Sequence, residues 1–265
     1  MKYLFALFFL YSTVTLVFGQ GISVSPSRVF FKGEAGQTVS QAITFQNGSN
    51  GTLDFVAQFK DWDRDSLGVK RYYPTGGGRH SNAEWLSLSE STLRLAPGES
   101  KSVVLSMTIP LANHAPLLTN SMLFFTQANE QSKMIRQGVA VNVLLEVGIQ
   151  VYHVPSGLTA GDLEFLAFED RGRIEQAGRV VRRMAVKVKN TGQINKDAYV
   201  RFELTSIESG AEIPVKAVAV AMLPEAEQWI QLDLPADLKG RYLAVAILDA
   251  GRQYDLKVAE KEITY

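Results

Sequence analysis

Three aspartates alternate in the segment DWDRDSLG, residues 61–68, and oxygen ligands at this spacing begin a calcium-binding EF-hand loop. That loop also needs a glycine at its sixth position and a glutamate at its twelfth, where this chain has Ser66 and Tyr72. The segment therefore predicts a solvated hairpin tip rather than a metal site.

Other residue types that could support catalysis are scattered. The three histidines, His80, His114 and His153, have no metal-ligand spacing, and the glycines at 76–78 lack the strand–loop–helix setting of a phosphate loop. No GxSxG motif is present, and the absence of cysteine excludes a thiol nucleophile and a thiolate metal site. We expect no enzyme activity, no cofactor and no bound metal.

Arg28 is a charged residue in an apolar, strand-like run, SPSRVFFKG, residues 25–33. A guanidinium is always charged near neutral pH and is costly to bury without a partner. Three interpretations are open at this point. Arg28 lies on the solvent face, pairs with an acid of this chain, or binds an acid that arrives from another molecule.

The bulk composition is typical of a folded protein that does not bind nucleic acid. The chain has 265 residues, enough for two ordinary domains, and 46% of them are hydrophobic. Its 27 basic and 27 acidic residues balance, whereas nucleic-acid-binding proteins favour an excess of positive charge.

The first 19 residues predict export. Lys2 precedes a mostly apolar run that ends at Gly19, as in a cleaved signal peptide. A membrane anchor is the alternative, but the run is short and contains Ser12 and Thr13. No later run is long and apolar enough to span a bilayer, so we do not expect a membrane-embedded chain. An exported protein without cysteine must fold without disulfides.

Short strands separated by turn residues dominate the rest of the chain. The predicted strands are 39–46, 53–59, 102–109, 121–127 and 139–151, then 163–168, 180–188, 198–205, 213–221, 228–234, 241–248 and 254–264. This pattern predicts an all-β protein with two sandwich-like halves. The break at PSG, residues 155–157, puts the boundary between a first domain, 20–154, and a second, 155–265.

The segment 139–151, VAVNVLLEVGIQV, is the most regular predicted strand, because every odd position is apolar. It is longer than the five or six residues, roughly, of an ordinary strand. Part of its apolar face therefore needs cover from something other than its own sandwich core.

Most of residues 22–155 resemble the N-terminal domain of periplasmic pilus-assembly chaperones, the PapD-like family. The resemblance lies in SRVFFKG, in LRLAPGESKSVVLSMTIP at 93–110, in NSMLFFTQ and in VLLEVGIQVYHVP, taken in this order. The second half, with LPADLKGRYLAVAILDAG, is more loosely similar to the family's C-terminal sandwich. The resemblance implies two immunoglobulin-like β-sandwich domains joined at an angle, in a divergent member of the family.

The resemblance also implies a function. Such chaperones lend their long strand to a fimbrial or surface-protein subunit that lacks its last strand, which is donor-strand complementation. The residues implied to contact the client are Val141, Val143, Leu145, Val147 and Ile149. The family anchors the client's terminal carboxylate with an Arg and a Lys, which align with Arg28 and with the neutral Gln150.

The implied partners are a pilin-like or surface-protein subunit and, as an open question, an outer-membrane usher, with the periplasm as the implied location. The rival interpretation is a structural or adhesive immunoglobulin-like protein of the cell envelope that binds a protein or a glycan.

Overall fold

The computed structural model describes residues 21–111, 117–129, 134–136, 139–141 and 144–265, with only the backbone described for the two short internal pieces. The predicted signal peptide, residues 1–19, lies outside the described residues. In the described part of the chain, no helix is long and apolar enough to cross a membrane.

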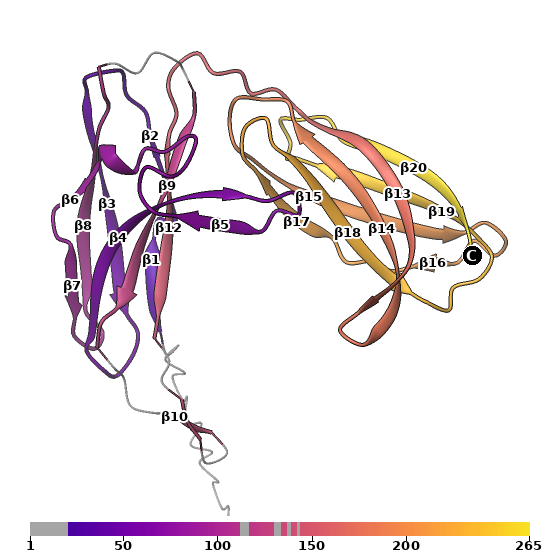
Figure 1. Cartoon of the computed structure of the whole chain (residues 1–265), viewed down its shortest axis with the longest axis horizontal. Coiled ribbons are helices and arrows are strands. Elements are labelled where there is room, and N and C mark those ends of the chain that lie inside the picture. Colours follow the sequence, from indigo (N-terminus) through magenta and orange to yellow (C-terminus); the bar gives the residue numbers. More distant parts are fainter. Residues whose placement is uncertain (1–20, 112–116, 130–133, 137–138, 142–143) are drawn as a thin grey trace, which may run out of the picture.

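Two sets of β-sheets, one from each half of the chain, stand at an angle to each other (Figure 1). The elements of the first half are β1 (Ile22–Ser25), β2 (Arg28–Phe31), β3 (Thr38–Asn47), β4 (Leu53–Arg64), β5 (Lys70–Tyr73), the short helix η1 (Ala83–Trp85), β6 (Leu86–Leu88), β7 (Thr92–Leu95), β8 (Ser100–Thr108), β9 (Thr119–Gln127), β10 (Met134–Arg136), β11 (Val139–Val141) and β12 (Glu146–His153). The elements of the second half are β13 (Leu163–Gln176), β14 (Arg179–Asn190), β15 (Lys196–Ser206), β16 (Glu212–Ile213), β17 (Val218–Met222), β18 (Glu227–Pro235), β19 (Arg241–Asp249) and β20 (Lys257–Thr264).

The first sandwich packs the sheet β1-β3-β8-β6 against the sheet β2-β12-β9-β4-β5, to which β7 is added through β4. Strand alternation turns one face of each sheet inward. The resulting core is apolar, and within it the centres of the Phe45 and Phe125 rings lie 4.5 Å apart.

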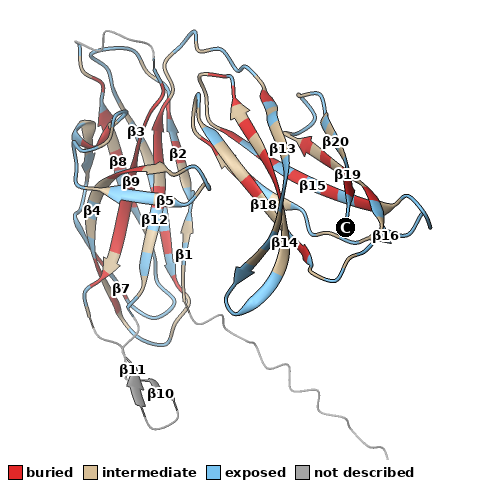
Figure 2. Ribbon diagram, turned by 45° about the vertical axis from the view of Figure 1, so that its right-hand side comes forward, coloured by how far each residue is buried: buried red, intermediate tan, exposed pale blue. Residues whose placement is uncertain are grey.

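The second sandwich packs β13-β14-β18 against β16-β15-β19-β20, with β17 paired to β15. Its core takes alternate residues of β15, from Ala198 to Leu204, and of β19. Buried residues lie along the inner strands of both sandwiches, whereas the far end of the β13–β14 hairpin is exposed (Figure 2). The predicted fold class, two immunoglobulin-like β-sandwiches, is confirmed, and each core holds together without a disulfide.

Two predicted strands are interrupted. The segment predicted at 213–221 is split into β16 and β17, because Pro214 has no N–H to donate to a ladder. The segment predicted at 139–151 is split into β11, which pairs with β10, and β12, which pairs with β9 and β2. At the break, the Leu145 carbonyl still accepts the backbone N–H of Gln127 at 2.8 Å, whereas the Leu145 N–H donates to the Gln127 side chain at 3.1 Å.

The last strand of the first sandwich ends at His153 and the first strand of the second begins at Leu163. The domain boundary at 154/155 stays a prediction, and it lies within this connection. The β4–β5 hairpin crosses from the first sandwich to the second (Figure 1), where the backbone N–H of Trp229 on β18 donates to the Ser66 carbonyl at 2.7 Å.

Candidate functional site

The outer face of the sheet β2-β12-β9-β4-β5 turns toward the second sandwich. On it, Trp62, Leu118, Met122, Phe124 and Tyr152 form an apolar group that we call the junction cluster. Ile194 and Leu223 of the second sandwich pack against this cluster. The candidate site therefore lies where the two sandwiches meet, on a face that is already partly covered.

Arg28 and Gln150 are neighbours at the rim of the junction cluster. They are register partners in the parallel pair of β2 and β12, and parallel register partners point to the same face. The resemblance aligned these two residues with the family's anchor, and the structure brings them together.

Gln150 contributes a hydrogen-bond donor to this rim. Tyr152 donates its hydroxyl to Gln150 Oε1 at 2.6 Å, which leaves the Gln150 amide nitrogen without a partner among the described contacts. Burial raises the pKa of Tyr152, so this phenol remains a protonated donor.

Arg28 has an acid of its own chain as a partner. Its guanidinium donates a hydrogen bond to the Asp197 carboxylate on β15, and this bond raises the pKa of Arg28. Of the three interpretations open from the sequence, the intrachain pair is present in the structure. Because one third of the Arg28 side chain stays exposed, at 33%, the pair does not seal the guanidinium from other carboxylates.

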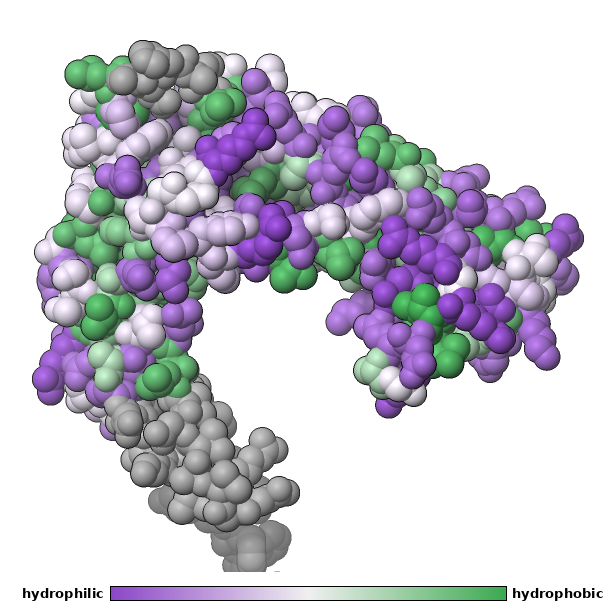
Figure 3. Space-filling model, in the orientation of Figure 1, coloured by the Kyte–Doolittle hydropathy of each residue, from purple (hydrophilic) through white to green (hydrophobic). Residues whose placement is uncertain are grey.

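Two further cations lie on the same face. Arg64 and Lys70 are directly opposite each other in the antiparallel β4–β5 pair, and both stand over the Trp62 ring, at 5.6 and 5.5 Å from its centre. Hydrophilic and hydrophobic residues lie side by side on the surface where the two sandwiches meet (Figure 3). Arg64 also lines a small pocket with Tyr152 and Asp197, so the hairpin reaches the Arg28 pair.

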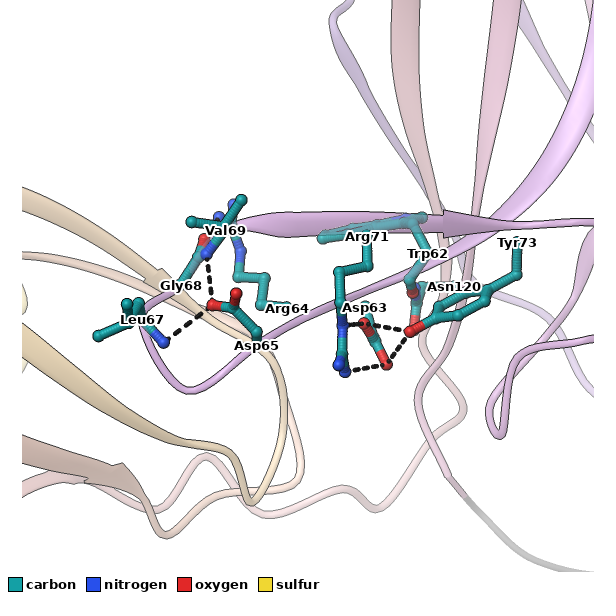
Figure 4. Close-up of polar contacts among 10 residues, drawn as sticks. All are labelled: Trp62, Asp63, Arg64, Asp65, Leu67, Gly68, Val69, Arg71, Tyr73 and Asn120. Carbon is teal, nitrogen blue, oxygen red and sulfur yellow. Dashed lines mark hydrogen bonds and ion pairs between the residues drawn. The ribbon is translucent and has the colours of Figure 1, made fainter.

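The aspartates of DWDRDSLG have structural partners. Asp61 is buried and accepts hydrogen bonds from the Gly78 N–H and the Ser81 hydroxyl, at 2.9 and 2.6 Å. Asp63 accepts two hydrogen bonds from Arg71, and Asp65 accepts the N–H groups of the turn (Figure 4). The predicted hairpin is present, but its tip is not free in solvent on all sides, because Ser66 bonds to β18. Within the described residues, no group of three or more acidic or histidine side chains is placed to hold a metal ion.

The residues predicted to contact a client divide into three groups. Val141 and Val143 lie outside the residues whose side chains are described. Leu145 and Val147 are half-buried at the start of β12, and Leu145 packs against the first core. Ile149 has no exposed surface and belongs to that core, so its side chain is not available to a second protein in this structure.

The start of β12 has an open backbone edge. Strand β12 pairs with β9 along its whole length, from Glu146 to His153, but it pairs with β2 only from Gln150 onward. In the described part of the chain, residues 146–149 therefore have no ladder partner on the β2 side. This edge ends at Arg28 and Gln150.

Sequence reasoning missed Arg64, Lys70 and Asp197. The strand alternation of β4 puts positions 60, 62 and 64 on one face, so a hairpin register drawn from the sequence could have found the first two. No local signal marks Asp197, which lies 169 positions after its partner Arg28.

No protein-family model and no curated protein matches the chain. Among solved structures, it is similar to the CsuC–CsuE chaperone–tip adhesion subunit pre-assembly complex from archaic chaperone-usher Csu pili of Acinetobacter baumannii. The identity is 12%, the match covers 91% of this chain and 97% of that chain, and the TM-score is 0.50. The chain is also similar to the YadV chaperone, at 13% identity over 91% of this chain and 99% of that chain, with a TM-score of 0.48. At these identities the comparison shows the fold: the chain has the two-sandwich architecture of PapD-like pilus chaperones, as the sequence motifs predicted.

Proposed function

We propose that this protein is a periplasmic chaperone of the PapD-like type that caps strand-deficient fimbrial or surface-protein subunits by donor-strand complementation. The observation that carries the proposal is the open edge of β12, residues 146–149, which ends at Arg28 and Gln150 in a fold shared with a chaperone solved with a tip subunit. The proposal includes export through cleavage after residue 19, no enzyme activity and no cofactor.

An open strand edge can pair with a strand of another chain. The direction of that strand follows from the charges. A strand that runs parallel to β12 along residues 146–149 brings its C-terminal end to the guanidinium of Arg28. An antiparallel strand would instead bring a positive N-terminus there, where Arg28 would repel it. The geometry therefore favours a parallel client strand whose terminal carboxylate meets Arg28 and the free amide nitrogen of Gln150.

The apolar side chains around the start of β12 supply the second half of the contact. Leu145 and Val147 are only half-buried in their own sandwich, so each can turn part of its surface to a client groove. Val141 and Val143 continue the same alternation in the sequence, and their contact with a client stays a prediction. Ile149 takes no part, because its side chain fills the first core.

The test starts from the protein purified from periplasm, with mass spectrometry of the chains that copurify. A peptide of the captured subunit's last strand is then titrated with the wild type and with Leu145→Glu, which puts a charge into the contact. We expect Leu145→Glu to lose binding, because an unpaired buried charge costs several kcal/mol, on the order of 5. The matched control is Val258→Glu, which adds the same charge at an exposed position of β20.

Circular dichroism of both variants must match the wild type for the comparison to count. A folded Leu145→Glu variant that binds the peptide as the wild type does would show that this segment is not the donor. If no strand-deficient subunit copurifies and the bound partner is a glycan or a complete domain, the protein is an adhesive or structural envelope protein instead.

A further inference from the structure

The two faces of the β4–β5 hairpin differ in their charge. On one face, Arg71 lies opposite Asp63 and donates two hydrogen bonds to it, at 2.8 and 2.9 Å (Figure 4). On the other face, Arg64 lies opposite Lys70, and like charges directly opposite each other on a sheet are destabilising. The hairpin thus pairs Arg71 with an acid on one face. On the face toward the junction of the sandwiches it places Arg64 and Lys70 side by side.

The charges of Arg64 and Lys70 are not balanced locally. In the described part of the chain, no carboxylate lies within 4.0 Å of either side chain's nitrogens. Arg64 donates instead to the Gly68 carbonyl at 2.6 Å, and both cations stand over the Trp62 ring. A neutral carbonyl and an aromatic face hold the two groups in place without cancelling their charge.

Arg28 belongs to the same electrostatic group. Burial lowers the pKa of Arg64, and the positive charge of Arg28 adds to this lowering, while Tyr152 and Asp197 oppose it. Burial also lowers the pKa of Lys70, with the charges of Arg64 and Arg28 adding to the effect. Three cations from two edges of one sheet therefore act on each other across the junction cluster.

Asp197 is the acid that reaches this group, and it comes from the other sandwich. It pairs with Arg28 and lines the same small pocket as Arg64 and Tyr152, while 54% of its side chain remains exposed. Glu146, an acid on the same sheet face, lies farther along β12 and accepts a hydrogen bond from Thr126. Within the described residues, the Asp197 carboxylate is the one acid that these contacts bring to the three cations, so the group keeps a net positive charge.

We propose that Arg64 and Lys70 form, together with Arg28, a three-cation site for a carboxylate of another chain, and that Asp197 occupies this site in the free protein. The ligand class rests on the proposed function, in which the end of the client strand arrives beside Arg28. The hairpin then supplies the charge that Gln150 lacks. Binding is a competition, because the incoming carboxylate must displace Asp197.

The test uses acetate as the probe, since acetate carries the carboxylate and little else. The full mature chain is titrated with acetate and, as a neutral isostere, with acetamide, while the arginine Nε–Hε resonances are followed by NMR. We expect acetate, but not acetamide, to shift the signals of Arg28 and Arg64. Asp197→Asn should tighten acetate binding by about threefold to tenfold, the range expected when a partly exposed competing charge is removed.

Arg64→Gln and Lys70→Gln, made in the Asp197→Asn background, should each weaken acetate binding by a similar factor. The matched control is Lys60→Gln, which removes a cation that stands over the Phe124 ring on the same sheet face. Equal effects of Lys60→Gln and of the two hairpin substitutions would overturn the proposal, as would shifts confined to Arg28. Because this titration needs no client, a protein that binds acetate as described but captures no subunit would contradict the proposed function alone. The inference alone would be contradicted by a different result. In that case the protein captures the subunit through the subunit's free carboxylate, and Arg64→Gln and Lys70→Gln leave this capture unchanged.

Discussion

The Arg28 guanidinium donates a hydrogen bond to the Asp197 carboxylate, and this ion pair joins β2 of the first sandwich to β15 of the second. The partners also contribute to the rim of the junction cluster, together with Tyr152 and Arg64. The charge in the apolar run 25–33 therefore has a resting partner that holds it at the boundary between the sandwiches.

We expect this pair to contribute little to stability. Both side chains are partly exposed, at 33% and 54%, and such ion pairs are worth about 0.2–1 kcal/mol. A double-mutant cycle with Arg28→Ala and Asp197→Ala, read by urea unfolding, should give a coupling energy in that range. The coupling should shrink in high salt, since exposed charges are screened. A coupling energy of about 3 kcal/mol or more, as for buried pairs, would contradict the expectation.

Truncation should cost much more stability at Ile149 than at Leu144. Ile149 has no exposed surface, so Ile149→Ala removes core packing and should lower the free energy of unfolding by about 2–5 kcal/mol. Leu144 is 56% exposed and lies in no strand, so Leu144→Ala should change it by less than about 0.5 kcal/mol. Urea unfolding of the client-free protein measures both. Equal, small effects would mean that Ile149 is not a core residue in solution.

The sequence predicted the strands well where one face of the sheet is buried. In β8 the buried residues Val103, Leu105 and Met107 alternate with exposed ones, and the same period marks β15 and β19. The prediction of one continuous strand at 139–151 failed at Leu145. There the alternation of apolar residues continues in the sequence although the strand is interrupted. Apolarity at every second position does not specify where a ladder ends, and here the Leu145 carbonyl bonds to the Gln127 backbone while the Leu145 N–H bonds to the Gln127 side chain.

The candidate site was only partly predictable. The order of the motifs predicted Arg28 and Gln150 as site residues, and the two are register partners in the structure. The motifs could not predict Asp197, because a contact between two separate sandwiches depends on how the sandwiches are placed and not on the local sequence pattern. The burial of Ile149 could not be predicted either. Apolar residues at alternate positions of a strand look the same in the sequence whether they pack in the core or contact a partner.

The stability of the second sandwich should depend on pH through Asp162 and Lys257. Their side chains meet at 2.7 Å, between the start of β13 and the start of β20. Burial alone would raise the pKa of Asp162, but the hydrogen bonds from Lys257 and from the Leu163 N–H outweigh it and lower that pKa. The hydrogen bond to Asp162 raises the pKa of Lys257.

The sign follows from these two directions. The contribution of Asp162 is fully present above its ordinary pKa of 3.8 and is lost as pH falls through its lowered value in the folded protein. The contribution of Lys257 is present below its ordinary pKa of 10.5 and is lost as pH rises through its raised value. Asp162→Asn should therefore reduce stability across the neutral range and make no difference at strongly acidic pH. Asp237→Asn, at an exposed acid with no ion pair among the described contacts, is the control. Parallel stability–pH curves for wild type and Asp162→Asn would contradict the assignment.

Gln150→Lys and Gln150→Glu should move anion binding and stability in opposite directions. A lysine at 150 faces Arg28, its register partner, and loses the hydrogen bond from Tyr152, so it should lower the free energy of unfolding by about 1 kcal/mol. The same lysine adds a fourth cation to the site and should tighten acetate binding by about threefold to tenfold. A glutamate at 150 pairs with Arg28, so it should preserve or raise stability and abolish acetate binding. Urea unfolding and acetate titration of the two variants measure both effects. If the two substitutions change acetate affinity alike, the side chain at 150 does not face the bound carboxylate, and the anchor lies wholly with Arg28 and the hairpin.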